Sequence, residues 1–157
     1  MKSLLCAALL ATFPLVAQAA DSNAFDGTYK VQAETVHWSN GQLPEGFSLS
    51  ITLDFQDGRI HYQSVNDTKP NDPKRNDFFI VLDDQAHPLP GYTRYNEIRG
   101  RQLSGDEFEV LHQLDGDVVV AEFWRFLPDG RTLVRRGVGK SPEGQSKAFE
   151  ETFLRVK

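Results

Sequence analysis

The chain has 157 residues, with 17 Lys and Arg against 22 Asp and Glu, which gives a formal net charge of −5 at pH 7. This length suits one domain with a substantial hydrophobic core. The acidic balance argues against binding to nucleic acid or to anionic membrane surfaces. After residue 20, no stretch is long and apolar enough to predict a membrane span.

The chain begins with MKSLLCAALLATFPLVAQAA, in which one lysine precedes a short apolar run and small residues follow. This is the build of a secretory signal peptide, and the run is too short for an anchor. Small residues occupy the −3 and −1 positions for cleavage after Ala19. We therefore expect residues 1–19 to be removed and residues 20–157 to form one exported domain, in the periplasm or outside the cell. The only cysteine, Cys6, lies in the removed part, so no disulfide is expected.

The remaining sequence reads as successive strands with alternating apolar and polar residues. The clearest stretch is FSLSITLDFQDGRIHYQSV, residues 47–65, in which every second residue of the first nine is apolar. Asp57-Gly58 then turns the chain into a second strand. Only one helical turn is expected, near residues 21–25. The predicted strands cover residues 27–33, 47–55, 60–65, 78–83, 92–102, 108–114, 117–127, 131–140 and 147–156.

About eight or nine consecutive antiparallel strands predict an all-β fold, a single up-and-down antiparallel barrel, because closure removes the two edges of an open meander. Two segments interrupt it. Residues 66–76, NDTKPNDPKRN, predict a mobile loop or lid, and residues 37–46, HWSNGQLPEG, predict a long loop with Trp38 exposed. At this strand number the lumen is either filled by side chains or holds one small ligand, and counting strands does not decide between them.

Three short motifs carry a family resemblance. GTYK at residues 27–30, HPLPG at residues 87–91 and DGRTL at residues 129–133 stand in the order found in small exported bacterial proteins of lipocalin-like build. Gly27-Thr28-Tyr29 resembles the Gly-x-Trp start of the lipocalins and their calycin relatives, with Tyr in place of Trp. The resemblance implies a lipocalin-like barrel with an apolar pocket. It also implies that Arg155, in the last strand, packs across the ring of Tyr29 beside Gly27 and closes the barrel.

The sequence gives little support to catalysis. It has no G-x-S-x-G motif, and no cysteine would remain after export. The four histidines, His37, His61, His87 and His112, share no metal-ligand spacing. No metal site and no cofactor are therefore predicted. An enzyme would have to rely on His112 as its acid or base, and no second catalytic group is placed beside it.

Polar and aromatic residues that interrupt the apolar alternation are the candidates for a ligand pocket. His112 shares an apolar face with Phe108 and Val110, and either Arg94 or Arg136 is expected to point inward and bind an acidic head group. Glu122 falls on the face of Trp124, and an interior Glu122 would need an arginine as its partner. The predicted ligand-binding residues are Tyr62, Tyr92, Arg94, His112, Trp124 and Arg136.

These patterns predict an exported protein that binds a small apolar or amphiphilic molecule in the barrel lumen. The alternative is a protein-interaction or inhibitor module that contacts a partner through the loops around Trp38 and around residues 70–73. Enzymatic activity has the least support. The patterns predict no nucleic-acid partner and no membrane span, and they leave the oligomeric state open.

Overall fold

A computed structural model describes residues 23–141 and 143–157 of the chain. The predicted signal peptide and its cleavage after Ala19 lie outside the described residues. Part of the expected helical turn, residues 21–22, lies outside them as well. Next along the chain is a turn closed by a hydrogen bond from the Asp26 N–H to the Asn23 carbonyl, at 3.0 Å. No helix among the described residues has the length and hydrophobicity of a bilayer-spanning segment.

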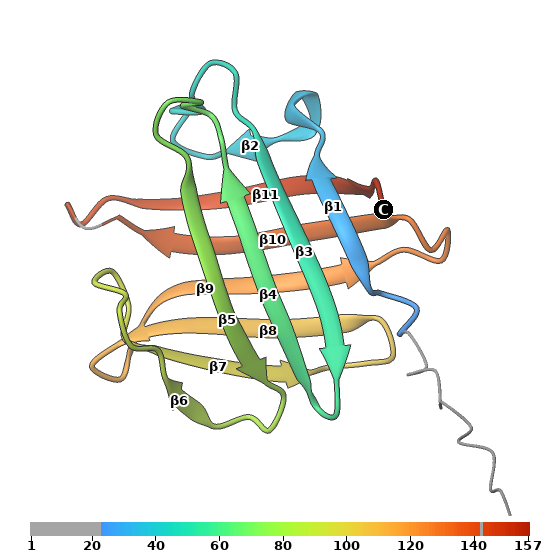
Figure 1. Ribbon diagram of the computed structural model, residues 1–157. Coiled ribbons are helices and arrows are strands. Elements are labelled where there is room, and N and C mark those ends of the chain that lie inside the picture. Colours follow the sequence, from blue (N-terminus) through green and yellow to red (C-terminus); the bar gives the residue numbers. More distant parts are fainter. Residues whose placement is uncertain (1–22, 142) are drawn as a thin grey trace, which may run out of the picture.

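The protein is an all-β, nearly closed antiparallel barrel, as predicted (Figure 1). Residues 23–141 and 143–157 contain eleven strands, because two short strands, β2 and β6, add to the nine expected ones. The strands are β1 (Gly27–Val31), β2 (His37–Trp38), β3 (Leu49–Gln56), β4 (Arg59–Asn66), β5 (Lys74–Val81), β6 (Ala86–Pro88), β7 (Glu97–Gln102), β8 (Glu107–Leu114), β9 (Asp117–Phe126), β10 (Thr132–Lys140) and β11 (Ser146–Arg155), with a short 3-10 helix, η1, at Ala33–Thr35.

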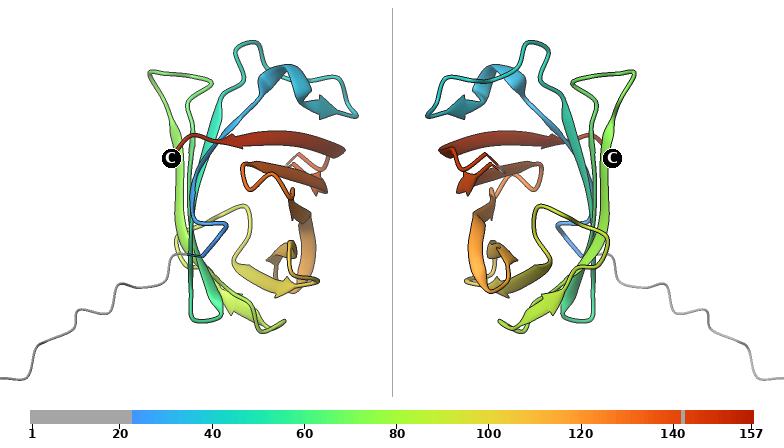
Figure 2. Two further views of the ribbon diagram at one scale, coloured as in Figure 1. Left: turned by 90° about the vertical axis from the view of Figure 1, so that its right-hand side faces the viewer. Right: turned by 90° about the vertical axis from the view of Figure 1, so that its left-hand side faces the viewer.

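The strands form one continuous sheet in the order β5-β4-β3-β1-β11-β10-β9-β8-β7-β6, and β2 pairs with β11. Strands β1, β3, β4 and β5 make one half, and the strands from β7 to β11 cross behind it (Figure 1). Side views show the interior between the two halves (Figure 2). The first strand joins them, because Tyr29 lies opposite Ile51 of β3 and opposite Arg155 of β11.

The two ends of this sheet meet along a seam between β5 and β7. The Asp84 N–H donates to the Gly100 carbonyl across the seam at 3.0 Å. Gly100 is required for this approach, because a Cβ there would lie 2.4 Å from Ile80 Cγ2 and 2.9 Å from the Val81 carbonyl oxygen. The barrel is therefore closed by packing at this end of the seam rather than by a full ladder of hydrogen bonds.

One half of the lumen is filled by aromatic side chains. Phe25 stacks on Phe126 with 4.2 Å between ring centroids, and both rings make edge contacts with Phe55 and Phe108. Tyr29 packs edge-on against the same cluster through Phe126. Such contacts between large rings stabilise a core beyond the burial of their area. The apolar wall that begins at Phe47 therefore faces a solid core over part of its length.

Arg155 lies against Tyr29 at this filled end. Its Cζ is 5.3 Å from the ring centroid of Tyr29, and its Nε and Nη2 donate to the Tyr29 hydroxyl at 3.1 and 2.8 Å. Arg155 also donates to the Ala24 carbonyl. Gly27 lies beside this pair, where a Cβ would meet the Lys157 carbonyl oxygen at 2.4 Å. These contacts tie the first strand to the last.

Two loop predictions need correction. Trp38 is half-buried rather than exposed, because it belongs to β2 and its ring packs on Phe47 with centroids 5.3 Å apart. The segment 66–76 is not a loop throughout, since β4 ends at Asn66 and β5 begins at Lys74. The first residues of β5 were not predicted as strand because the side chain that points inward there is polar. Asn76 faces the interior and donates a hydrogen bond to the Ser64 hydroxyl at 2.9 Å.

Candidate functional site

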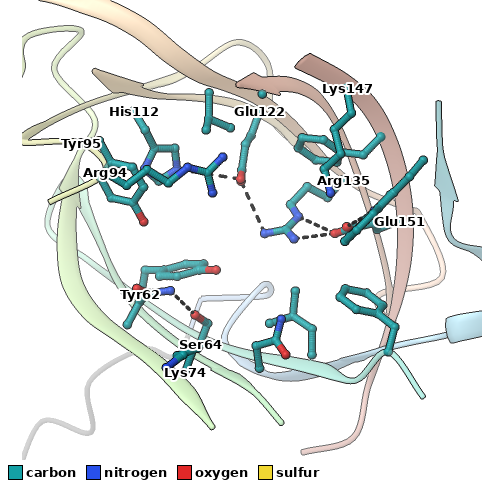
Figure 3. A pocket seen from close by; sticks show the side chains of 18 of the residues that line it. Tyr62, Ser64, Lys74, Arg94, Tyr95, His112, Glu122, Arg135, Lys147 and Glu151 are labelled. Carbon is teal, nitrogen blue, oxygen red and sulfur yellow. Dashed lines mark hydrogen bonds and ion pairs between the residues drawn. The ribbon is translucent and has the colours of Figure 1, made fainter. Parts of the chain in front are cut away.

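Beyond the aromatic cluster, the lumen contains a cavity of about 290 Å³ (Figure 3). It lies at the end of the barrel that carries β2. Rings of Phe47, Phe78 and Phe149 and the side chains of Leu49 and Val120 form the apolar part of its wall, and most of the other lining residues are polar or charged. The lumen is thus filled by side chains in one half and hollow in the other. The two alternatives that the strand pattern left open, a filled lumen and a lumen with space for a small ligand, therefore each apply to a different half of the barrel.

A buried ion network lines the cavity. Arg135 of β10 donates through Nε and Nη2 to Glu151 Oε2 at 3.1 and 2.5 Å, and its Nη1 lies 3.6 Å from Glu122 Oε2. The sheet register places Arg135 directly opposite Glu151. The three side chains are only 4–11% exposed. Buried charges are stable only when they are paired, so each member of this network depends on the others.

The network also fixes the charge of its members. Burial would raise the pKa of Glu122, but Arg135 and His112 outweigh burial and hold it below its usual value. Burial would lower the pKa of Arg135, and the two carboxylates overcome this and raise it. The interior of the cavity therefore keeps one arginine cation between two carboxylates at neutral pH.

His112 of β8 is the neutral neighbour of this network. Its ring lies 4.5 Å from that of Tyr95, and its Nε2 is 3.8 Å from Glu122 Oε1. Burial lowers the pKa of His112, and the nearby Arg135 and Arg94 act in the same direction, against Glu122. Its Nδ1 is buried and has no hydrogen-bond partner among the described residues. The site thus contains a neutral imidazole with one unsatisfied nitrogen.

We expect acidification to destabilise the protein in two stages. The pKa of His112 is lowered in the fold, so below about pH 6.5 the unfolded chain binds a proton that the folded chain does not. The lowered pKa of Glu122 gives stability that is present above the unfolded value of 4.5 and is lost as the pH falls through the folded value. Both terms make stability fall with falling pH, and urea unfolding between about pH 7.5 and 3 measures it. The His112→Gln variant should lose the first stage only; an unchanged slope between pH 7 and 5.5 would contradict this assignment.

Two aromatic residues form the floor between the cavity and the core. Tyr62 of β4 lies against Phe78 and Trp124, with ring centroids 5.0 and 5.7 Å away. Burial raises the pKa of Tyr62, which keeps its hydroxyl protonated. Trp124 does not line the cavity but donates from Nε1 to Glu122 Oε2 at 2.8 Å. Trp124 therefore holds the Glu122 carboxylate of the ion network in place from the side of the core.

The loop between β6 and β7 closes the site on one side, and we call its residues 89–96 the strap. The hydroxyl of Tyr92 accepts from the Asp77 N–H at 3.0 Å and donates to the Asp77 carbonyl at 3.3 Å. Arg94 reaches the other side and donates to the Lys140 carbonyl at 3.1 Å. The strap is therefore attached to β5 at one point and to the end of β10 at another.

The structure brings Tyr62, Arg94 and His112 together as lining residues. Tyr92 and Trp124 lie beside the cavity. Arg136 does not belong to the site: it is exposed on the outer face and pairs with Glu150 at 2.7 Å. Its neighbour Arg135 takes the inward place, because Leu133, Arg135 and Gly137 share the inner face of β10.

Three further lining residues had no signal in the sequence. Glu151 and Lys147 alternate inward along β11, and Trp38 reaches them from β2. The Trp38 Nε1 donates to Glu151 Oε1 at 3.1 Å, and the Lys147 ammonium lies over the Trp38 ring. Only the pairing of β2 with β11 brings them together. Among the described residues, no group of three His, Cys, Asp or Glu side chains is arranged to hold a metal ion.

Comparison with known proteins adds the fold class. No protein-family model matches the sequence, and no curated protein matches it. The zebrafish ileal bile acid-binding protein, solved with cholic acid, has a TM-score of 0.54 and 11% identity, over 85% of this chain and 100% of that one. The fatty acid binding protein of Schistosoma mansoni, solved with arachidonic acid, has a TM-score of 0.56 and 9% identity, over 85% of this chain and 97% of that one. At such identities the likeness shows the fold alone, an antiparallel β-barrel.

Proposed function

We propose that this protein binds a small organic molecule in the cavity of its barrel. The observation that carries the proposal is the hollow of about 290 Å³, which interrupts an otherwise packed lumen and is lined by buried polar groups. The polar groups of Ser64, Asn76, Glu122 and Arg135 line this hollow. A bound molecule would supply contacts that the chain itself does not provide.

The molecule must be small. The cavity is at the lower end of the range for ligand pockets, roughly 300–1,000 Å³. The aromatic cluster of Phe25, Phe55, Phe108 and Phe126 occupies the space beyond the floor. The two solved neighbours were complexed with cholic acid and arachidonic acid, which supports ligand binding in such barrels. Here we infer a shorter ligand that stays above Tyr62.

The test is mass spectrometry of a solvent extract of protein purified natively, with a variant that fills the cavity. Gly139 faces the cavity, and a Cβ there makes only ordinary contacts, with Val120 at 3.5 Å and Arg94 at 3.8 Å. A leucine at this position would project into the hollow. We expect a stoichiometric small molecule from the wild type and from Val138→Leu, which changes the outer face, and none from Gly139→Leu. The same molecule at full occupancy in Gly139→Leu would refute the cavity as its site.

The alternative of a partner bound through the loops has less support. Trp38, its expected anchor, is half-buried and donates a hydrogen bond to Glu151 inside the barrel. An anchor for a protein partner would have to be accessible.

Export and cleavage after Ala19 remain a proposal based on the sequence alone.

A further inference from the structure

The charges that line the cavity are not balanced. They comprise two carboxylates, Glu122 and Glu151, and four cations. Arg135 pairs with both carboxylates, and Lys74 pairs with Asp72 at the exposed rim, at 2.9 Å. Among the described residues, Arg94 and Lys147 form no ion pair within 4 Å. In a chain with net charge −5, two cations without a direct ion-pair partner, the exposed Arg94 at the cavity mouth and the half-buried Lys147, make the local potential more positive.

These two cations converge on the same space from different elements. Arg94 comes from the strap and Lys147 from β11, and both lie beside Gly139. Gly139 is the cross-strand partner of Lys147, and a Cβ on Gly139 would lie 3.8 Å from Arg94 Nη2. The missing side chain therefore leaves room between the ammonium and the guanidinium. The Trp38 ring beneath the Lys147 ammonium holds that cation in place.

The surroundings of Lys147 disfavour its charged form. Partial burial lowers the pKa of Lys147 to about 8, and Arg94 and Arg135 lower it against the opposing effect of Glu151. A negative group placed between Arg94 and Lys147 would reverse this effect. The wall of the same cavity also carries the rings of Tyr95, Phe78 and Phe149. Charged and aromatic surfaces thus face one small volume.

Building on the proposed function, we propose that the ligand is a small ring-bearing organic carboxylate. Its carboxylate would lie between Arg94 and Lys147, and its ring would pack against Tyr95 and Phe78. Arg94 can donate two parallel hydrogen bonds to a carboxylate, and Lys147 adds a point charge. The neutral His112 imidazole and the paired Glu122 lie deeper and are not needed for the charge. The carboxylate of such a ligand would pair with the two cations, Arg94 and Lys147, that form no ion pair with the buried network.

The test compares phenylacetate with phenylacetamide, a neutral molecule of the same shape, by titration calorimetry near pH 7. We expect phenylacetate to bind at least about tenfold more tightly, and Arg94→Gln or Lys147→Gln to weaken it by about tenfold without changing phenylacetamide binding. Arg136→Gln, on the outer face, is the matched control and should change neither. Equal binding of the two probes, unchanged phenylacetate affinity in both variants, or no phenylacetate binding at millimolar concentration would overturn the proposal. A neutral molecule in the native extract that Gly139→Leu excludes would leave the proposed function standing and refute the carboxylate class.

A pH profile separates a direct role of Lys147 from a structural one. Lys147 is cationic below its pKa, so phenylacetate affinity should fall as the pH rises through about 8. Lys147→Arg should keep tight binding and lose this dependence, and Lys147→Gln should bind weakly at every pH. The other charged groups around Lys147 are Glu151 of β11, Arg135 of β10, Glu122 of β9, Arg94 of the strap and Glu143 in the turn between β10 and β11. A profile that stays the same in Lys147→Arg would show that one of these groups is responsible and would overturn the role of Lys147.

Discussion

Arg135→Met should lower the free energy of unfolding by about 3–5 kcal/mol, because it leaves two buried carboxylates without their cation. The side chains of Glu122 and Glu151 are 11% and 4% exposed, so water cannot replace the guanidinium. Urea unfolding followed by tryptophan fluorescence measures the loss, and Trp124 lies next to the site as a reporter.

The neighbouring residue supplies the control. Arg136→Met removes an exposed arginine that pairs with Glu150 on the outer face, so we expect a loss of at most about 1 kcal/mol. Replacing Glu122 and Glu151 by Gln together with Arg135→Met should recover most of the stability, because no buried charge then remains. Equal losses in Arg135→Met and Arg136→Met would show that the network is not buried in solution.

Gly100→Ala should destabilise the protein by about 1–3 kcal/mol, because the added methyl group overpacks the seam. Its Cβ would lie 2.4 Å from the side chain of Ile80 and 2.9 Å from the Val81 carbonyl oxygen, and the backbone cannot yield as a flexible side chain would. Gly105→Ala is the control, since nothing lies within 4 Å of a Cβ there. Thermal unfolding of both variants measures the difference.

The seam itself can be observed in Gly100→Ala. The Asp84 N–H donates to the Gly100 carbonyl at 3.0 Å, so its hydrogen exchange should accelerate when the strands move apart. Exchange of strands far from the seam, such as β10 and β11, should change only as much as global stability requires. Unchanged protection of Asp84 in a destabilised variant would mean that the strain is relieved elsewhere.

The fold was predictable because its signals are local. Alternation with a period of two and Asp-Gly turns define strands without knowledge of their partners. The turn residues Asp57 and Asp115 adopt the left-handed conformation, as such turns require. Strands β2 and β6 were not predicted because two or three residues cannot show alternation. The pairing of β2 also depends on β11, which is more than a hundred residues away in the chain.

The site was predictable only in part. The sequence indicated that an interior Glu122 needs an arginine without indicating which one, and the structure supplies Arg135. Arg136, predicted to bind the ligand, lies on the outer face instead. Val134 and Val138 alternate with Arg136 and imitate an inward face, although Val138 is 57% exposed. The true inner face carries Gly137, where a Cβ would lie 2.3 Å from the Ala121 carbonyl oxygen, so close backbone packing replaced the expected apolar side chain.

The attachment of Tyr92 to β5 also bears on how the protein avoids self-association. A strand at the end of an incompletely paired sheet offers N–H and C=O groups to the strands of other chains, which leads to aggregation. The Tyr92 hydroxyl occupies both backbone groups of Asp77, where a foreign strand would otherwise pair. Lys74 and Arg75 add charge to the same strand. A single side chain thus does for part of this strand what a further strand would do, without closing the barrel completely.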